Sequence, residues 1–334
     1  MKWLQSCTVA QLQSIARSIG SNTGGKKDVL RSHVLDELQH DRFTLPSGNG
    51  RSGPSQHKIV SIDMGIRNLA ICSITVSERR HPNQPLAVPV VQNWERIAIS
   101  KKANADIPEE GTDGSIAKEA FDPQTYAQYA YDLVVKRIMT YQPTQILIER
   151  QRFRSMGGSA VQEWTLRVNM FEAMIYATLR TLSEIKLWQG LVYPVAPAKV
   201  SKFWLEDDND EHAKLATSKS LKTKSAKIAL VGDWLYKGQL FELQGEAAVT
   251  ARAYQMKLAR RRERKGAAKQ MATAEQSQVP HDIGKLDDLA DCLMQAIAWI
   301  QWEKNRRALR SGEPKVMGSV HFASENRSRS RKSK

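Results

Sequence analysis

The sequence is poor in cysteine, has no long apolar run and has no histidine-based metal motif, and each absence argues against a class of protein. The three cysteines, Cys7, Cys72 and Cys292, are widely spaced and form no Cys-x-x-Cys pair, which argues against a disulfide framework and a cysteine zinc site. No stretch approaches about 18 uncharged apolar residues, so we expect no membrane-spanning helix. The first residues lack a charged segment followed by an apolar core, so we expect no secretory signal. The seven histidines include no His-Glu-x-x-His or His-x3-His spacing.

Positive charge is concentrated in two parts of the chain. The net charge is +15, and residues 252–269 and 306–334 carry +7 each. Clustered basic residues suit a polyanion such as nucleic acid, because each neutralised phosphate releases condensed counterions. The simpler alternative is a solvated helix and a disordered tail. Hydrophobic residues make up 41% of the 334 residues, which is enough for a packed core.

Composition and patterning divide the chain into several parts. They are a small helical module at 1–42, a linker rich in Gly, Ser and Pro at 43–57, a main domain at 58–307 with a basic helical insertion near 246–270, and a basic tail at 308–334 that we expect to be disordered. In the first module, Thr8 caps one predicted helix, Gly20 ends it, and a second helix begins near Lys26.

The main domain alternates between short apolar runs and longer segments with helical spacing. Strands are predicted at 58–63, 69–75, 91–99, 145–149 and 191–195, and helices at 123–141, 158–187, 223–236, 246–270 and 286–307, with a further helix of about ten residues after Pro197. The first two strands are expected to be antiparallel, joined by a tight reversal. This order predicts an α/β layered fold with a mixed sheet.

Two of these strands end in a lone carboxylate. Asp63 closes the run Ile59-Val60-Ser61-Ile62, and Glu149 closes Ile146-Leu147-Ile148. A carboxylate at the tip of a buried strand is costly unless it is paired or ligates a cation, and strand ends are where open α/β sheets build their sites. Either acid alone could instead cap the following turn.

A third acidic element lies on the last predicted helix. Asp287 and Asp291 lie about 40° apart around the helix axis, and Asp288 and Asp291 about 60° apart. Such acids repel one another unless a cation lies between them, although acids in a first turn also complement the helix dipole. Carboxylate oxygens are ligands that Mg²⁺ or Mn²⁺ prefers, and two such ions could activate a water and stabilise the leaving oxygen of a phosphodiester.

Three strings carry a resemblance to the ribonuclease H-like superfamily, in particular its RuvC-like Holliday-junction resolvase branch. They are Ile59-Val60-Ser61-Ile62-Asp63-Met64-Gly65-Ile66-Arg67-Asn68, Ile148-Glu149-Arg150-Gln151-Arg152-Phe153-Arg154 and Lys285-Leu286-Asp287-Asp288-Leu289-Ala290-Asp291. The second string looks closest to the fungal mitochondrial cruciform-cutting endonucleases, in which a SAP-like module precedes the nuclease domain. The helical module at 1–42, with Gly24-Gly25 before Lys26 and Lys27, is similar to that DNA-binding module.

The resemblance implies a ribonuclease H-like mixed β-sheet flanked by helices and a homodimer that grips a four-way DNA junction. Each subunit would nick one of two like strands with Mg²⁺. By position, Asp63, Glu149 and Asp291 would be metal ligands, and the fourth would be Asp288 or Asp287. It also implies a mitochondrial location, while the Arg/Ser/Lys tail leaves a nuclear address open.

Several basic or polar side chains are candidates for DNA contact. Arg suits phosphate and Gln can reach base edges, and Phe153 would stack on or wedge between bases, or anchor the loop. The candidates are Arg150, Gln151, Arg152, Phe153, Arg154, Lys26, Lys27, Lys222 and Lys224, with Lys199 and Lys202 as weaker ones. The SAP-like module could hold the junction, carry the protein to bulk DNA, or pack against the partner subunit.

Two other functions share many of these features. A nuclease for RNA–DNA hybrids or for transposition would use the same acids. A non-catalytic DNA-packaging protein would use the same basic surface, but it would have no need of carboxylates on all three elements.

Overall fold

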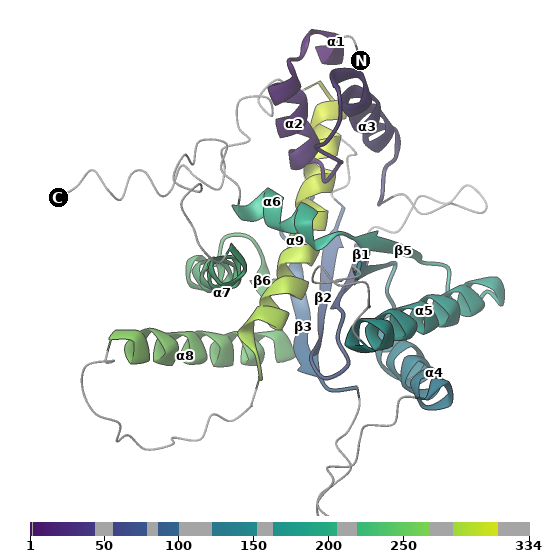
Figure 1. Ribbon diagram of the computed structural model, residues 1–334, viewed down its shortest axis with the longest axis vertical. Coiled ribbons are helices and arrows are strands. Elements are labelled where there is room, and N and C mark those ends of the chain that lie inside the picture. Colours follow the sequence, from purple (N-terminus) through teal and green to yellow (C-terminus); the bar gives the residue numbers. More distant parts are fainter. Residues whose placement is uncertain are drawn as a thin grey trace, which may run out of the picture.

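A six-stranded mixed sheet forms the centre of the molecule (Figure 1). The computed structural model describes residues 1, 3–43, 56–78, 86–99, 122–151, 163–205, 219–266 and 283–312. The strands are β1 (Gln56–Asp63), β2 (Leu69–Ser77), β3 (Val90–Ile97), β4 (Gln145–Glu149), β5 (Leu191–Val195) and β6 (Glu242–Leu243), in the spatial order β5-β4-β1-β2-β3-β6. Strands β1, β2 and β3 form an antiparallel meander, β4 and β5 run parallel to β1, and β6 runs parallel to β3.

The predicted α/β class and the antiparallel pairing of the first two strands are confirmed. Strand β1 begins at Gln56 rather than at Lys58. The sequence did not predict β6, because two residues are too few to show any alternation of polar and apolar side chains.

Helices cover both faces of the sheet (Figure 1). They are α4 (Pro123–Tyr131), its continuations η1 (Asp132–Arg137) and η2 (Ile138–Tyr141), α5 (Glu163–Glu184), α6 (Pro197–Leu205), α7 (Lys219–Lys237), α8 (Glu246–Gly266) and α9 (Leu286–Arg310). Because strand side chains alternate between faces, Ile146 and Ile148 of β4 pack in the core with α4 and α5, whereas Leu147 packs in the core with α9.

Local chemistry explains where α4 begins. The side chain of Asp122 accepts a hydrogen bond from the Thr125 N–H at 2.8 Å, and Pro123 occupies the first turn, as the sequence predicted. The predicted helix to Tyr141 is continuous in space but passes through a π-helical turn, η1, and a 3-10 turn, η2. It ends at Gln142, whose φ of 50° is left-handed.

Helix α9 spans the molecule from the N-terminal helices to the region of α8 (Figure 1). Its 25 residues extend to Arg310, three residues beyond the predicted end, and give it a length of about 37 Å. The helix is buried on most sides because the sheet, α6, α7 and the N-terminal helices all contact it. It therefore connects the acidic residues at its start to the N-terminal module at its end.

The N-terminal module consists of α1 (Trp3–Ser6), α2 (Val9–Ser18) and α3 (Lys27–Gln39), with a small core of its own. Thr8 and Gln11 form a reciprocal capping box at the start of α2. Gly20 has a φ of 71°, and the Trp302 indole occupies the space that a β-carbon would need, so no other residue fits there. The turn after α2 is held by α9, since Arg306 donates to the Ile19 carbonyl at 2.7 Å.

Some predicted segments fall outside the described residues. These are most of the linker, the end of the basic insertion and nearly all of the tail. Among the helices that are described, none combines the length and apolar character needed to cross a membrane.

Candidate active site

Asp63 and Glu149 lie side by side at the carboxyl ends of two parallel strands. Strands β1 and β4 pair in parallel, with Ile62 opposite Ile148. The next residues, Asp63 and Glu149, therefore lie on adjacent strand ends, and adjacent strands are about 4.8 Å apart. The two carboxyl groups lie within hydrogen-bonding reach of each other, and a hydrogen bond between them would need a proton. Burial, this hydrogen bond and the charges of Glu149, Asp291 and Asp288 raise the pKa of Asp63 well above its ordinary value.

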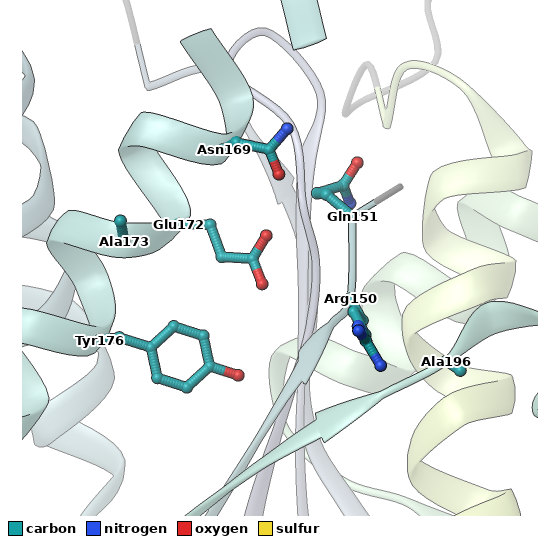
Figure 2. A pocket seen from close by; sticks show the side chains of 7 residues that line it. All are labelled: Arg150, Gln151, Asn169, Glu172, Ala173, Tyr176 and Ala196. Atoms are coloured by element: carbon teal, nitrogen blue, oxygen red, sulfur yellow. The ribbon is translucent and has the colours of Figure 1, made fainter. Parts of the chain in front are cut away.

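The chain continues from Glu149 into Arg150 and Gln151. The Arg150 N–H donates to the Val195 carbonyl at 2.8 Å, which extends the pairing of β4 and β5 by one residue, and its side chain is exposed. Together with Ala196, these two residues face helix α5 across a pocket, whose α5 wall is formed by Asn169, Glu172, Ala173 and Tyr176 (Figure 2). The sequence did not point to this pocket.

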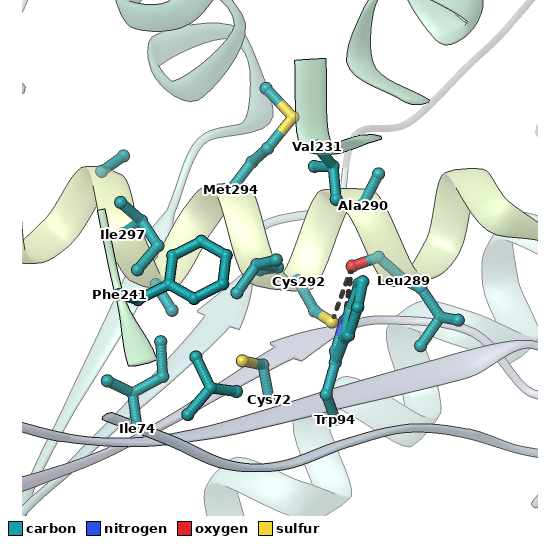
Figure 3. Packing of buried hydrophobic residues seen from close by; sticks show 14 of the residues in the cluster. Cys72, Ile74, Trp94, Val231, Phe241, Leu289, Ala290, Cys292, Met294 and Ile297 are labelled. Atoms are coloured by element: carbon teal, nitrogen blue, oxygen red, sulfur yellow. Dashed lines mark hydrogen bonds between the residues drawn. The ribbon is translucent and has the colours of Figure 1, made fainter. Parts of the chain in front are cut away.

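The three aspartates of α9 lie over the sheet near these strand ends. Helix α9 is fixed there by Gln295, whose buried amide donates to Ser61 Oγ at 3.0 Å and to the Ile62 carbonyl at 3.3 Å. Figure 3 shows a second anchor, where the Trp94 indole of β3 donates to the Leu289 carbonyl at 2.9 Å and Cys292 lies against the sheet. These contacts hold Asp288 and Asp291 close enough for their charges to act on Asp63.

Each aspartate of α9 has a cationic neighbour. From α7, Lys227 lies 2.7 Å from Asp291 and Lys224 lies 2.8 Å from Asp287. Arg96 of β3 lies 3.5 Å from Asp288. The sequence did not single out Arg96 or Lys227, because only the fold brings β3 and α7 to the start of α9.

The same three aspartates differ in their electrostatics. Burial and the neighbouring Asp287 charge raise the pKa of Asp288 to about 6, despite Arg96. Burial also raises the pKa of Asp291 to about 6, although Lys227 works against it. Asp287 behaves differently: burial would raise its pKa, but the hydrogen bond and charge of Lys224 bring that pKa below its ordinary value.

The donor chemistry of this acidic site suits a hard divalent cation. All its candidate ligands are carboxylate oxygens, and Asp288 Oδ2 is buried with no hydrogen-bond donor among the described residues. Within the same residues, no three acidic, histidine or cysteine side chains already surround a common point. The aspartates would therefore turn away from their lysine partners to share a cation.

The structure describes some of the other residues predicted to contact DNA and leaves others outside the described ranges. Arg152, Phe153 and Arg154 lie outside the described residues, as does the side chain of Lys222. Lys26 is exposed and Lys27 is partly exposed at the start of α3, in the module at the far end of α9 from the acids. Lys199 and Lys202, the weaker candidates, contact the N-terminal module: Lys199 donates to the Gly20 carbonyl at 3.0 Å and Lys202 lies 3.4 Å from the Thr23 hydroxyl.

Comparisons with known proteins agree with this architecture. A family model described as "Mitochondrial resolvase Ydc2 / RNA splicing MRS1" matches residues 59–309, well over half of the chain. The "Cruciform cutting endonuclease 1, mitochondrial" of Schizosaccharomyces pombe is 25% identical over 304 residues, which cover 90% of this chain and 94% of that protein. The protein of the same name from Saccharomyces cerevisiae is 22% identical over 321 residues, which cover 91% of this chain and 84% of the relative.

A solved structure shows the same fold. The crystal structure of the yeast mitochondrial Holliday junction resolvase Ydc2 matches with a TM-score of 0.52 and 23% identity, covering 91% of this chain and 97% of that one. The ribonuclease H-like class, with a mixed sheet flanked by helices, is thereby confirmed.

Proposed function

The chain belongs to the family of the mitochondrial resolvase Ydc2 and the RNA-splicing protein MRS1, and from that premise we propose that it is a mitochondrial endonuclease that resolves four-way DNA junctions. The observation that carries the proposal is the pairing of Asp63 and Glu149 on adjacent strand ends beneath the aspartates of α9. Relatives that cover nearly the whole chain are named cruciform-cutting endonucleases. We further propose that two copies act together, each nicking one of two like strands.

We propose that Asp63, Glu149, Asp291 and Asp288 bind the Mg²⁺ or Mn²⁺ ions, two per active site, on which the reaction depends. Asp288, Cys292 and Gln295 follow one another at helical spacing on a single stripe of α9, and Gln295 hydrogen-bonds to the sheet beside Asp63. Asp287 lies off that stripe and is held by Lys224 of α7. This difference favours Asp288 over Asp287 as the fourth ligand.

When bound, such ions activate a water and stabilise the leaving oxygen of a phosphodiester. The chain's own residues orient the reactants: the fixed strand ends position Asp63 and Glu149, and Gln295 positions the aspartates of α9. Arg150 is exposed directly after Glu149 and would bind the phosphate backbone beside the cut site. Lys224 and Lys227 would neutralise phosphates once their aspartates turn toward the cations.

DNA contacts away from the acids are assigned by charge. We propose that Gln151, Arg152, Phe153 and Arg154 contact the strand near the branch point, and that Lys222 adds to the basic surface of α7. Lys26 and Lys27, in the SAP-like module, would contact an arm of the junction. Because the turn after α2 is tied to α9 by Asn305 and Arg306, such a contact would orient the acids as well.

The proposal is tested with a synthetic four-way junction and a linear duplex of matched sequence, each with and without Mg²⁺. We expect paired nicks in the junction only, and only with the metal. Equal cutting of the duplex would overturn the resolvase assignment, and junction binding without cutting would favour a packaging or RNA-splicing role. Asp63→Asn should abolish cutting while keeping junction affinity. Asp233→Asn of α7, whose half-exposed side chain pairs with Lys237, should change neither.

A further inference from the structure

A pocket of about 770 Å³ lies between helix α5 and the ends of β4 and β5, next to the acids (Figure 2). Its α5 wall is one helical face, since Asn169, Glu172, Ala173 and Tyr176 are spaced by three or four residues. The opposite wall is made by Arg150, Gln151 and Ala196. A volume of this size is typical of sites that take a small organic group.

The walls of this pocket combine an aromatic ring with polar groups. The Glu172 carboxyl faces the backbone N–H of Gln151 on the opposite wall. Asn169 donates one amide N–H to the Thr165 carbonyl at 2.8 Å, which leaves its side-chain oxygen available. The Tyr176 hydroxyl oxygen is buried and has no hydrogen-bond partner among the described residues, and a buried polar atom of this kind requires an explanation.

The position of the pocket relative to the acids sets what could enter it. Gln151 follows Glu149 by two residues, so the two Cα atoms are at most about 7 Å apart. A DNA strand advances about 3.4 Å per nucleotide. If the phosphate to be cut lies at Glu149, an adjoining nucleotide therefore lies over the pocket.

Chemistry selects a base rather than a phosphate as the occupant. Glu172 and Arg150 put one acidic and one basic group on opposite walls, so the pocket carries no net positive charge that would favour a phosphate inside it. A base presents donors and acceptors at its edge and an aromatic face, which match the Glu172, Asn169 and Gln151 side chains and the Tyr176 ring. Unstacking a base is least costly where pairing is already interrupted, as at the branch point of a junction.

We propose that this pocket receives the unstacked base of a nucleotide adjoining the cut phosphate, and that Glu172 and Tyr176 determine which base is accepted. The inference rests on the proposed function, because it requires a DNA strand at Asp63 and Glu149. Cutting by this chain would then depend on base identity at one position near the branch point.

The test uses the full-length protein and a set of junctions that carry each of the four bases at the nucleotides flanking the branch point. Single-turnover cutting is measured for the wild type, Glu172→Gln and Tyr176→Phe. Both changes preserve side-chain shape, and removing a hydroxyl that has no partner should not destabilise the free protein. Glu184→Gln, at the exposed end of the same helix, is the matched control.

We expect the wild type to prefer one base by roughly tenfold or more. Glu172→Gln and Tyr176→Phe should reduce that preference to below about threefold while junction affinity stays within about twofold, and Glu184→Gln should keep it. Replacing the preferred nucleotide by an abasic one should make the wild type and the variants cut at the same rate, because the base that Glu172 and Tyr176 would contact is absent.

Other outcomes overturn the inference in separate ways. An unchanged base preference in both pocket variants would exclude the pocket while leaving junction cutting intact. A shift of the variants' oligomeric state in size-exclusion chromatography would mean that a second copy of the chain occupies the pocket. A wild type that cuts no junction would overturn the proposed function instead; the pocket is then judged by binding, where equal wild-type affinity for the intact and abasic junctions would exclude it.

Discussion

Lys227 of α7 places its ammonium group 2.7 Å from Asp291 of α9, yet the pKa of Asp291 remains raised to about 6. Burial is the largest cause, and the nearby Glu149 and Asp287 charges add to it. One lysine therefore does not compensate for the crowding of acids at the start of α9. The site is built with excess negative charge, and a divalent cation would relieve it.

The first prediction concerns stability of the metal-free protein against pH. Because Asp63, Asp288 and Asp291 have raised pKa values in the folded state, the folded chain holds protons between about pH 4 and 6 that the unfolded chain has released. Stability must then fall as pH rises through that window. We expect the Tm without metal to be several degrees lower at pH 7.5 than at pH 5, with Mg²⁺ or Mn²⁺ restoring it at pH 7.5 and having little effect at pH 5.

A variant isolates one of these groups. The rise in the pKa of Asp288 to about 6 corresponds to a loss of at most about 3 kcal/mol of folding stability at neutral pH. The actual loss is smaller, because Asp288 is coupled to the neighbouring acids. Asp288→Asn should raise the metal-free Tm at pH 7.5 by about 3 °C. Asp233→Asn, which removes a half-exposed ion pair with Lys237, should not raise it. A Tm that rises from pH 5 to pH 7.5 without metal would contradict this account.

The second prediction separates the two adjacent aspartates of α9. Asp288 shares a stripe with the sheet-bound Gln295, whereas Asp287 faces Lys224. Asp288→Asn should therefore reduce single-turnover junction cutting with Mg²⁺ by at least about a hundredfold, because it removes a metal ligand. Asp287→Asn should reduce it by less than about tenfold. The reverse order would identify Asp287 as the fourth ligand. Junction affinity, measured alongside, should stay within about twofold for both.

Much of this site could be predicted from sequence because its acids close short apolar runs. Ile59 to Ile62 and Ile146 to Ile148 predict two buried strands, and the next residue of each is a carboxylate. Parallel pairing then brings Asp63 and Glu149 together. The helical spacing of the α9 aspartates was equally visible.

The partners of these acids could not be predicted, because long-range packing alone defines them. Lys227 lies 64 positions before Asp291 in a helix whose sequence is simply basic and amphipathic, and Gln295 is an amide within an apolar helix face. The same holds for Glu172 and Tyr176, which gain meaning only when α5 is placed opposite Gln151. Strand β6 is too short for any pattern.

The third prediction concerns the attachment of the N-terminal module. Glu303 and Arg306 are both fully buried and lie 2.8 Å apart, and Arg306 also donates to the Ile19 carbonyl. Among the described residues, Arg306→Met would leave Glu303 with the more distant Arg307 and Arg310, at 3.5 and 3.3 Å. Breaking a buried pair in this way costs about 3–5 kcal/mol.

We expect Arg306→Met to lower the Tm and to make residues 1–43 the first segment released in limited proteolysis. Arg180→Met, which removes an exposed ion pair with Glu184 on α5, should cost less than about 1 kcal/mol and serves as the control. A proteolysis pattern identical to the wild type would show that the module is held by its apolar contacts with α9, and not by this ion pair.

The fourth prediction concerns helix α8, whose apolar face packs on β3 and whose later turns continue past the edge of the sheet (Figure 1). Lys257 donates to the Gly284 carbonyl just before α9, which ties α8 to the start of the acidic helix. Arg252 and Arg261 are exposed on α8. If α8 lines an arm of the junction, each of these arginines that meets a phosphate contributes about one to the salt dependence of binding.

The double variant Arg252→Gln/Arg261→Gln should therefore reduce the slope of log Kd against log salt by about one to two and weaken binding of all junction sequences equally. Fluorescence anisotropy between about 50 and 300 mM salt measures both. Lys186→Gln, which removes one exposed positive charge beyond the end of α5, should leave the slope unaltered. Equal slopes for wild type and double variant would show that α8 is a solvated helix, and the basic surface that holds the arm would then have to come from α7 and the N-terminal module.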